Sequence, residues 1–389
     1  MPRILPLGEV SLIFSVFLDV PVHGLFKLHV TVAIQIEFKD EMMKAIRIIL
    51  ILIIFSSFMM GLEELVLTDK WEHADEIPGR IQYSTIDKDG CPVACFFKIG
   101  NRLITRDKIV SIAPWGQGPD EVMNTCSIFP YKDGDLAITE DPGRIKIFKK
   151  ETDNYKFKKS IWLKRGGTFH ALHNTVFFDG KFFTAGLEIL NYTQAEAEIS
   201  SIKVYDEEGN FLKNLMIEKL PTKTFETRNI VDMRRYILNY KDKIYYLIEN
   251  ELKVSIVSGK NLVDEKKVEL KKPDFYKKMP DDFFTVGKQG QSSIERSLNI
   301  EHWLVSYSRI TKTVVEKDWL IIQVRTCNPK LKRFSLLFYN AGNFNLEKTF
   351  FIDDLLLGAK DGKLYCYGDG DPGLDDEVVK TVIKIYSIK

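Results

Sequence analysis

Six segments of this chain repeat one pattern, in which an apolar strand is followed by a charged turn and a second apolar strand. The turns lie at Asp89-Gly90, Asp133-Gly134, Asp179-Gly180, Lys241-Asp242, Lys317-Asp318 and Asp361-Gly362. Asp-Gly between apolar runs is a strong hairpin signal, because glycine readily adopts the positive φ of a tight turn. A second alternating hairpin follows the second, third, fourth and fifth turns. Four successive antiparallel strands per repeat are typical of a propeller blade.

The spacing of the turns supports the same architecture. Their second residues lie at 90, 134, 180, 242, 318 and 362, so successive turns are 44, 46, 62, 76 and 44 residues apart. A propeller blade takes about 40–45 residues, and the two long intervals contain insertions at residues 188–198 and 271–298. We therefore predict an all-β, six-bladed β-propeller of four-stranded antiparallel blades. A sandwich and an irregular seven-bladed ring are the alternatives.

The two ends of the repeat region predict how the ring closes. The last repeat ends one strand short, with VVKTVIKIYSIK, whereas residues 62–71 form an apolar strand that has no partner in its own repeat. Pairing of residues 62–71 with residues 378–388 would complete the sixth blade and remove an exposed sheet edge. The predicted propeller therefore covers residues 62–389, with an N-terminal strand closing the last blade.

Residues 42–61 have the layout of a secretory signal peptide. Lys44 and Arg47 precede an unbroken apolar run from Ile48 to Phe55, and the small Gly61 ends the segment. The run is shorter than the roughly 20 residues that span a bilayer. We expect an extracytoplasmic protein, periplasmic or secreted, although an uncleaved leader would act as a short signal anchor. Since two methionines open this segment, residues 1–41 are interpreted as a misassigned start or a disordered extension.

Composition argues against some partners and some chemistry. The chain holds 55 Lys and Arg against 54 Asp and Glu, a formal charge of +1, so it has no global field to attract nucleic acid. Its five cysteines cannot all pair internally. Cys91 and Cys95 share one predicted strand, about 13 Å apart, which is too far for a disulfide. We expect buried thiols rather than a redox or metal pair.

Two segments carry a family resemblance. The linker after the first repeat matches G-x-G-P-x-E, and the strand after Asp133-Gly134 matches Arg-Ile-x-x-Phe, through Gly116, Gly118, Pro119, Glu121, Arg144, Ile145 and Phe148. The combination resembles the NHL-type six-bladed β-propeller proteins of bacteria, with a weaker copy at Ser201. The resemblance covers roughly residues 63–389 and implies an extracytoplasmic propeller, often of unknown function. It implies no activity, because this class of fold hosts hydrolases, lyases and binding modules.

Candidate binding residues lie where linkers and the loops between second and third strands meet on one face of such a ring. They are Trp115, Gln117, Asp120, Glu121, Asp141, Arg165, His170 and Asp375. His170 and His173 are three residues apart, which places them on opposite faces of a strand and disfavours joint metal ligation. The run GDGDPGLDDE, which contains Asp375, is interpreted as a solvated loop, since it departs from the spacing of a calcium loop. No catalytic residue, metal or cofactor is predicted.

We therefore predict an extracytoplasmic binding or scaffold module, monomeric, that presents one loop-rich face to a protein or glycan. One alternative is a hydrolase or lyase whose active site lies at the channel mouth. Its candidate residues are Asp232, Arg234, His170, Arg309 and Asp353. The other alternative is a membrane-tethered structural subunit, in which the leader stays uncleaved and is the only contact with the membrane.

Overall fold

The computed structural model describes residues 13–15, 31–33, 65–73, 80–141, 143–164, 169–222, 234–279, 305–368 and 381–388, without the side chains of residues 169–171. The chain divides into two units, Met1–Glu64 and Leu65–Lys389. In the first unit, β1 (Ile13–Ser15) pairs antiparallel with β2 (Thr31–Ala33). The second unit is the propeller.

The propeller consists of six four-stranded antiparallel sheets, numbered here as blades 1 to 6. The strands of each blade are given from the innermost to the outermost. Blade 1 contains β4 (Ile81–Ile86), β5 (Pro92–Phe96), β6 (Gly100–Ile104) and β7 (Ile109–Pro114). Blade 2 contains β8 (Thr125–Pro130), β9 (Leu136–Glu140), β10 (Arg144–Lys150) and β11 (Tyr155–Trp162). Blade 3 contains β12 (Phe169–Phe178), β13 (Lys181–Tyr192), β14 (Glu196–Asp206) and β15 (Phe211–Pro221).

Blades 4 to 6 follow in chain order. Blade 4 contains β16 (Arg235–Tyr240), β17 (Lys243–Ile248), β18 (Lys253–Ser258) and β19 (Val263–Glu269). Blade 5 contains β20 (Arg309–Glu316), β21 (Trp319–Arg325), β22 (Phe334–Asn340) and β23 (Leu346–Ile352). Blade 6 contains β24 (Leu355–Lys360), β25 (Lys363–Gly368), β26 (Thr381–Ile388) and β3 (Leu65–His73). The predicted six blades of four strands are confirmed.

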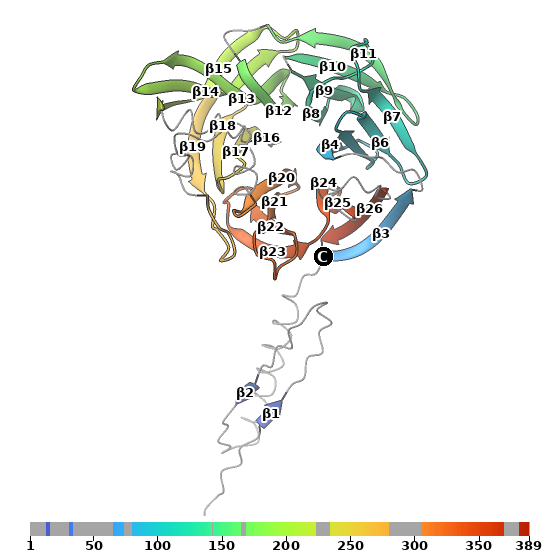
Figure 1. Ribbon diagram of the computed structural model, residues 1–389, viewed down its shortest axis with the longest axis vertical. Coiled ribbons are helices and arrows are strands. Elements are labelled where there is room, and N and C mark those ends of the chain that lie inside the picture. The colour runs from blue at the N-terminus through green and yellow to red at the C-terminus, as the bar shows by residue number, and fades with distance from the viewer. Residues whose placement is uncertain are drawn as a thin grey trace, which may run out of the picture. The chain divides into compact units, whose positions relative to one another are not determined.

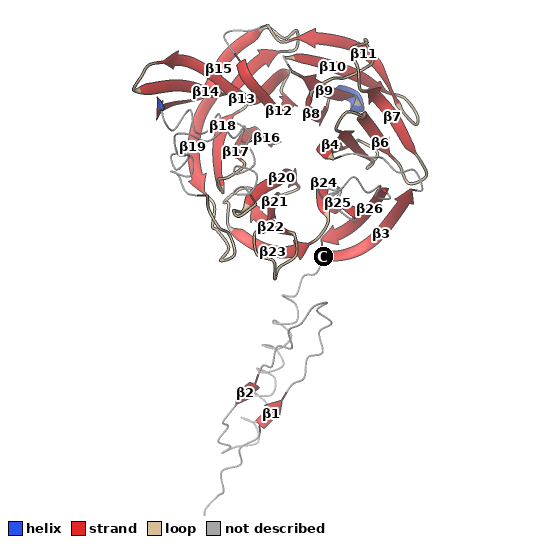
Figure 2. Ribbon diagram, in the orientation of Figure 1, coloured by secondary structure: helices blue, strands red, loops and turns tan. Residues whose placement is uncertain are grey.

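The innermost strands form a closed ring around a central channel. Each of β4, β8, β12, β16, β20 and β24 contacts the innermost strand of the next blade, and β24 contacts β4. Figure 1 shows the six sheets arranged radially, and Figure 2 shows that strands make up almost all of the regular structure. A short 3-10 turn lies at Lys132–Gly134.

The ring is closed as the two chain segments predict. Strand β3 pairs antiparallel with β26, in a register that runs from Thr381 opposite His73 to Ile388 opposite Leu65. The Trp71 ring also meets the Tyr365 ring edge-on, with centroids 6.3 Å apart. Blade 6 therefore takes its outermost strand from one end of the propeller sequence and its inner three strands from the other end.

The apolar core lies between the blades. A hydrophobic cluster fills each of the six interfaces between neighbouring blades. Because each sheet packs against a neighbour on both faces, many strands are buried along their whole length; β9 and β5 are examples. Aromatic rings supply much of this contact, as where Tyr245 and Phe344 meet edge-on between blades 4 and 5 at 5.3 Å.

The hairpin turns come in two forms. In blades 3 to 6 the first and second strands are joined by two residues, as predicted. Where the glycine is missing, Lys241 and Lys317 themselves adopt positive φ, at 55° and 53°. In blades 1 and 2 the prediction of a two-residue turn is wrong. There five residues, 87–91 and 131–135, join the strands, because Ile86 pairs with Pro92 and Pro130 with Leu136.

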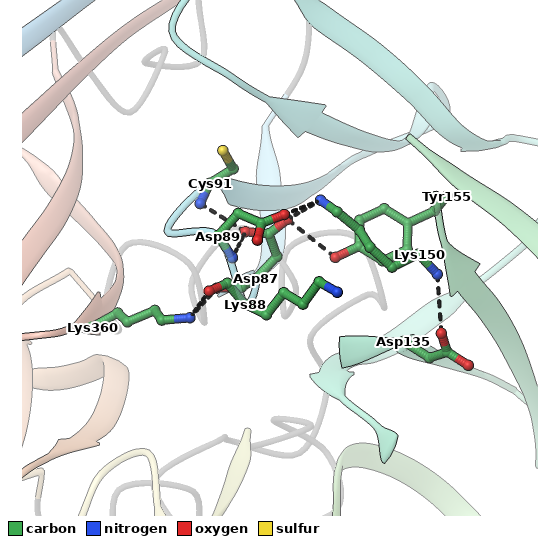
Figure 3. A network of polar contacts seen from close by, with 8 residues as sticks. All are labelled: Asp87, Lys88, Asp89, Cys91, Asp135, Lys150, Tyr155 and Lys360. Carbon is green, nitrogen blue, oxygen red and sulfur yellow. Dashed lines mark hydrogen bonds and ion pairs between the residues drawn. The ribbon is translucent and has the colours of Figure 1, made fainter. Parts of the chain in front are cut away.

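The longer turn of blade 1 is organised by a buried aspartate (Figure 3). The Asp87 carboxylate accepts hydrogen bonds from the backbone N–H groups of Asp89 and Cys91, at 2.9 and 2.8 Å. It also accepts one from Lys150 Nζ at 2.8 Å and one from the Tyr155 hydroxyl at 3.1 Å, both in blade 2. From blade 6, Lys360 Nζ donates to the Asp87 carbonyl oxygen at 2.9 Å. This cluster connects three consecutive blades.

Replacing Asp87 with alanine should lower the free energy of unfolding by about 2–3 kcal/mol, because several buried donors lose their acceptor. Asp89→Ala is the matched control. Its carboxylate also pairs with Lys150 but is 51% exposed, so we expect a loss below about 1 kcal/mol. Urea denaturation measures both values, and equal losses would contradict the role given to Asp87.

Candidate functional site at the mouth of the central channel

The order of the strands decides which loops share a face. In an antiparallel four-stranded blade, the loop between the second and third strands and the linker to the next blade lie at the same end. We call this end the linker face and the end with the charged turns the hairpin face. Both insertions leave the blades at the linker face: residues 193–195, within the first insertion, connect β13 to β14, and residues 271–279, the start of the second, follow β19. Of the second insertion, residues 271–279 are described.

The first insertion is mostly strand rather than loop. Strand β13 continues to Tyr192 and β14 begins at Glu196, so only residues 193–195 turn the chain. The three outer strands of blade 3 have 12, 11 and 11 residues, compared with 5 to 8 in the strands of blades 1, 2, 4 and 5. Figure 1 shows β13, β14 and β15 reaching past the rim of the ring. We call the protruding part of these three strands, residues 189–199 and 218–221, the ribbon.

A cavity of about 160 Å³ occupies the central channel. Its wall is made from all six blades, by residues at or near the starts of the innermost strands, and therefore lies toward the linker face. The polar lining residues are Arg80, Gln82, Tyr83, Ser84, Ser127, His173, Asn174, Arg234, Arg235, Tyr236, Glu249, Arg309, Thr311, Lys312, Thr313 and Arg325. No short segment of sequence could have shown this convergence, because the residues come from six separate repeats.

Two basic side chains reach across the channel. The Arg234 guanidinium, from blade 4, lies over the Tyr83 ring of blade 1, 5.7 Å from its centroid. Blades 1 and 4 are opposite each other in a ring of six. Lys312 Nζ, from blade 5, donates hydrogen bonds to the carbonyl oxygen and the hydroxyl of Ser84, the latter at 3.1 Å. These contacts join blades that are not neighbours and narrow the channel below the cavity mouth.

Glu249 and two further arginines of the wall have partners along its rim. Arg309 Nε donates to Glu249 Oε1 at 3.0 Å, and the backbone N–H of Arg234 donates to Glu249 Oε2 at 3.0 Å. Arg235 Nη1 lies 3.0 Å from His173 Nε2. Glu249 is thus held by an arginine and a backbone N–H of its own rim, which leaves it poorly placed as a free acid or base.

Two titratable side chains of the cavity wall have lowered pKa values. Burial, together with the charge of Arg234, lowers the pKa of Lys312 to about 7. Burial, together with the charges of Arg235 and Arg234, lowers the pKa of His173 to about 3. Both groups are pushed toward their uncharged forms, as expected where desolvation and like charges act together.

The lowered pKa of Lys312 predicts a pH-dependent stability. An unfolded lysine titrates near pH 10.4, so between about pH 7 and pH 10.4 the unfolded state holds a proton that the folded state lacks. Stability should therefore rise with pH across that window. Allowing for screening by water in the channel, we expect the free energy of unfolding of the protein to gain about 2 kcal/mol relative to Lys312→Met between about pH 7 and pH 10. Urea denaturation at several pH values measures this, and a constant difference would contradict it.

The linker-face residues predicted in blade 2 lie together but outside the cavity wall. Gln117, Asp120 and Asp141 are exposed, whereas Trp115 and Glu121 are half-buried. The Asp141 backbone N–H donates to the Asn124 carbonyl at 3.2 Å, which joins the linker and the loop between β9 and β10. These residues stay predictions as binding residues.

Part of that linker has a structural role that its sequence did not reveal. Glu121 Oε2 accepts a hydrogen bond from the Gly118 N–H at 2.7 Å, so its carboxylate is used inside its own loop. A Cβ at Gly116 would lie 2.1 Å from the same oxygen, which explains the glycine. The buried Lys146, in β10, donates hydrogen bonds to the carbonyl oxygens of Gly118 and Glu121.

The other predicted positions are distributed differently. Arg165, Asp375 and Asp232 lie outside the described residues, as does the side chain of His170. Of the candidates for an enzymatic site, Arg234 and Arg309 line the cavity. Asp353 is exposed on the linker between β23 and β24, where it accepts a hydrogen bond from the Arg333 N–H at 3.1 Å. Of the three candidates that the structure describes, Asp353 therefore lies outside the cavity wall that holds Arg234 and Arg309.

The cysteines and the possible metal ligands of the described residues bear on which chemistry this site could support. All five cysteines are free thiols, and burial raises the pKa of Cys95 to about 11 and of Cys126 to about 12. Within the described ranges there is no cluster of three or more His, Cys, Asp or Glu residues that could hold a metal ion.

The sequence predicted the channel mouth only as an alternative site, with Arg234 and Arg309 among its candidates, and sequence reasoning missed the rest of the cavity wall, although one further signal was present. Arg80, Arg234 and Arg309 stand immediately before, or at the first residue of, the innermost strands of blades 1, 4 and 5. Aligning the six repeats on their turns places an arginine at nearly the same position in three of them. In a closed ring, equivalent positions of innermost strands face the same channel, so this recurrence marks a cationic mouth.

Comparison with known proteins supports the fold. No protein-family model matches the sequence, and a search of curated proteins finds no match. The structure is similar to a member of the DUF4221 family from Bacteroides vulgatus, with a TM-score of 0.52 and 10% identity over 85% of this chain and 99% of that chain. It is also similar to a Bacteroides fragilis protein inferred to be exported, with a TM-score of 0.51 and 12% identity over 84% of this chain and 96% of that chain.

These identities are low enough that the likeness shows the fold alone. The chain is a six-bladed β-propeller that resembles proteins of Bacteroides, one of them inferred to be exported. The NHL type is not confirmed by these matches. In the part of the chain that the structure describes, no helix is long and apolar enough to cross a membrane. The predicted leader at residues 42–61 lies outside that part.

Proposed function

We propose that this protein is an extracytoplasmic binding module that presents its linker face to a protein or glycan partner. The observation that carries the proposal is the collection of distinctive features on that one face. The ribbon, residues 271–279 after β19 and the cavity mouth all lie there, whereas the described loops of the hairpin face are short turns. Loops on a rigid scaffold are where binding residues concentrate.

The ribbon offers the most accessible contact surface of that face. Leu190 and Tyr192 are 38% and 48% exposed, although both are large and apolar or aromatic. Its tip is well ordered, because Thr193 Oγ1 accepts the Glu196 N–H at 3.0 Å and Thr222 Oγ1 donates to the Thr193 carbonyl at 2.8 Å. A rigid strand pair with exposed aromatic and aliphatic side chains suits a protein partner or the face of a sugar.

The extracytoplasmic location and the NHL type are part of the same proposal. Their support is the signal-peptide layout of residues 42–61, the likeness to a protein inferred to be exported, and the G-x-G-P-x-E linker. N-terminal sequencing of the protein from its natural source tests the location. A mature chain that begins shortly after residue 61 is the expected result, and an intact leader would point instead to a membrane-tethered subunit.

Site-specific photo-crosslinking tests the binding face. A photoreactive residue at position 190 or 117 should give a discrete crosslinked product in the natural source, and one at position 212 should not. Leu212 is 44% exposed but belongs to the hairpin half of blade 3. Leu190→Ser with Tyr192→Ser should reduce the product formed from position 117 at least tenfold, whereas Leu212→Ser leaves that product unchanged. Products from position 212 alone would contradict the proposal.

A further inference from the structure

The wall of the central cavity carries a surplus of positive charge. Among its described lining residues, six side chains are basic and one is a carboxylate; the basic ones are Arg80, Arg234, Arg235, Arg309, Lys312 and Arg325, and the carboxylate is Glu249. Arg309 neutralises Glu249 through a two-nitrogen contact with one carboxylate oxygen. The whole chain has a formal charge of only +1. The charge of the cavity is therefore a local concentration rather than a general property of the surface.

This concentration of positive charge is energetically costly. Like charges brought together in a partly desolvated wall repel one another more strongly than they would in water. Burial lowers the pKa values of Lys312 and His173, and the charge of Arg234 lowers both further. A negatively charged occupant would relieve the repulsion, and few other occupants would.

We propose that the mouth of the central channel binds a small anion, one that carries a carboxylate, phosphate or sulfate group. Arg80 and Arg234 are the principal contacts. The planar guanidinium fork matches the oxygen pairs of these groups, and it stays charged at every physiological pH. Arg80 is exposed at the mouth, and its side chain makes no hydrogen bond or ion pair with a described residue. Arg234 is held in a fixed position over Tyr83.

The volume limits the size of the ligand. A water molecule needs about 10–15 Å³ of such space, so a cavity of about 160 Å³ has room for about 11 to 16 non-hydrogen atoms. This suits an acidic monosaccharide, a sugar phosphate or an inorganic oxyanion. The inference goes beyond the partner proposed above, because a small anion in the channel is compatible with any partner on the ribbon.

Lys312 gives the proposed site a measurable signature. The charged and titratable groups that face it across the cavity come from blades 1, 3, 4 and 5; they are Arg80, Tyr83, His173, Arg234, Arg235, Tyr236, Glu249, Arg309 and Arg325. A bound anion adds negative charge to this set and favours the protonated amine. Near pH 7.5, binding should therefore draw a proton from the buffer, and affinity should fall as the pH rises above about 7.

Isothermal titration calorimetry of the full-length protein tests the proposal at low salt and about pH 6.5. The probes are inorganic phosphate, sulfate, glucuronate and glucose 6-phosphate, with glucose as the neutral control. We expect saturable binding of at least one anion at one site per chain, none of glucose, and weakening by added salt. The four probes distinguish a carboxylate site from a phosphate or sulfate site. Absence of saturable binding by all four anions would overturn the proposal.

Matched variants locate the binding. Arg80→Gln should weaken it at least fivefold and Arg234→Gln at least tenfold. Arg106→Gln, an exposed arginine in the turn between β6 and β7 on the hairpin face, should leave it unchanged. If Arg234→Gln fails to fold, the affinity of Arg80→Gln for the anion decides whether binding occurs in this cavity. Equal affinities of Arg80→Gln and Arg106→Gln would overturn the assignment to this cavity.

Buffers of different ionisation enthalpy give a second readout near pH 7.5. Proton uptake on binding, lost in Lys312→Met, is the expected result, and binding without uptake would contradict the part given to Lys312. The test is separate from that of the partner. Failure of anion binding leaves crosslinking at position 190 unaffected, and failure of crosslinking leaves the calorimetry interpretable.

Discussion

Deleting residues 65–73 should turn the propeller into an aggregating or grossly destabilised protein. These residues are the whole of β3, which pairs along its length with β26 and completes blade 6. Without them, β26 becomes an exposed edge in which Val382, Ile383 and Ile385 had been buried. A long apolar edge strand is a template for pairing with another chain.

The expected loss is large because the deletion also opens the ring. Pairing of β3 with β26 joins the two ends of the propeller sequence, so blade 6 cannot separate from blade 1 without breaking a sheet. We expect the deletion to remove much of the roughly 5–15 kcal/mol that holds a domain folded, far beyond the ~1 kcal/mol of an ordinary substitution.

Size-exclusion chromatography and thermal unfolding measure the effect. A deletion of residues 2–41, which precede the predicted leader and contribute no strand to the propeller, is the control and should leave the melting temperature unchanged. A protein without residues 65–73 that stays monomeric and melts at the original temperature would refute closure by β3.

Replacing Lys203 with methionine should cost about 3–5 kcal/mol of stability. Lys203, in β14, and Glu188, in β13, form an ion pair of 2.8 Å in which each side chain is 1% exposed. The substitution leaves the Glu188 carboxylate buried beside an apolar group, without its counter-charge. Removing one partner of a buried pair is costly because the remaining charge stays desolvated.

A double variant separates charge from packing. Lys203→Met combined with Glu188→Leu removes both charges and should recover most of the lost stability, because apolar residues of similar volume commonly replace a buried pair without penalty. Lys219→Met is the matched control on the same blade. Its pair with Glu196 is 3.5 Å long and more than half exposed on the lysine side, so we expect a loss below about 1 kcal/mol.

Urea denaturation of the three variants and the unaltered protein measures these values. If the double variant were as unstable as Lys203→Met alone, loss of packing rather than an uncompensated charge would be the cause. If Lys203→Met and Lys219→Met were equally stable, burial would not matter to the pair.

Local signals were enough to predict the strand pattern. Asp-Gly turns and apolar runs act over a few residues, so the six hairpins could be located without knowing where the rest of the chain lies. The number of blades and the pairing of residues 62–71 with the last repeat followed from counting strands that lacked partners. Turn length was mispredicted at Asp87, where contacts with Lys150 and Tyr155 of another blade stabilise a five-residue loop.

Surface and interior were harder to tell apart from sequence. Glu188 was assigned to an insertion on the linker face, yet it is buried because β13 continues through it and Lys203 lies opposite. Glu121 was a candidate for binding, but its carboxylate closes its own loop on Gly118. In both cases a charged residue is satisfied by a partner that local sequence gives no reason to expect, so its charge alone predicted exposure.

The amino-acid sequence by itself determined the class of fold, the number of blades and the segment that closes the ring. Each of these follows from hairpins that form between residues close in the chain, repeated six times, with one strand left over before the first repeat and one missing from the last. Only the tertiary structure decided where a ligand could bind. Arg80, Arg234 and Lys312 are separated by up to 232 residues, and they share one cavity because closing the ring points every innermost strand at the same axis.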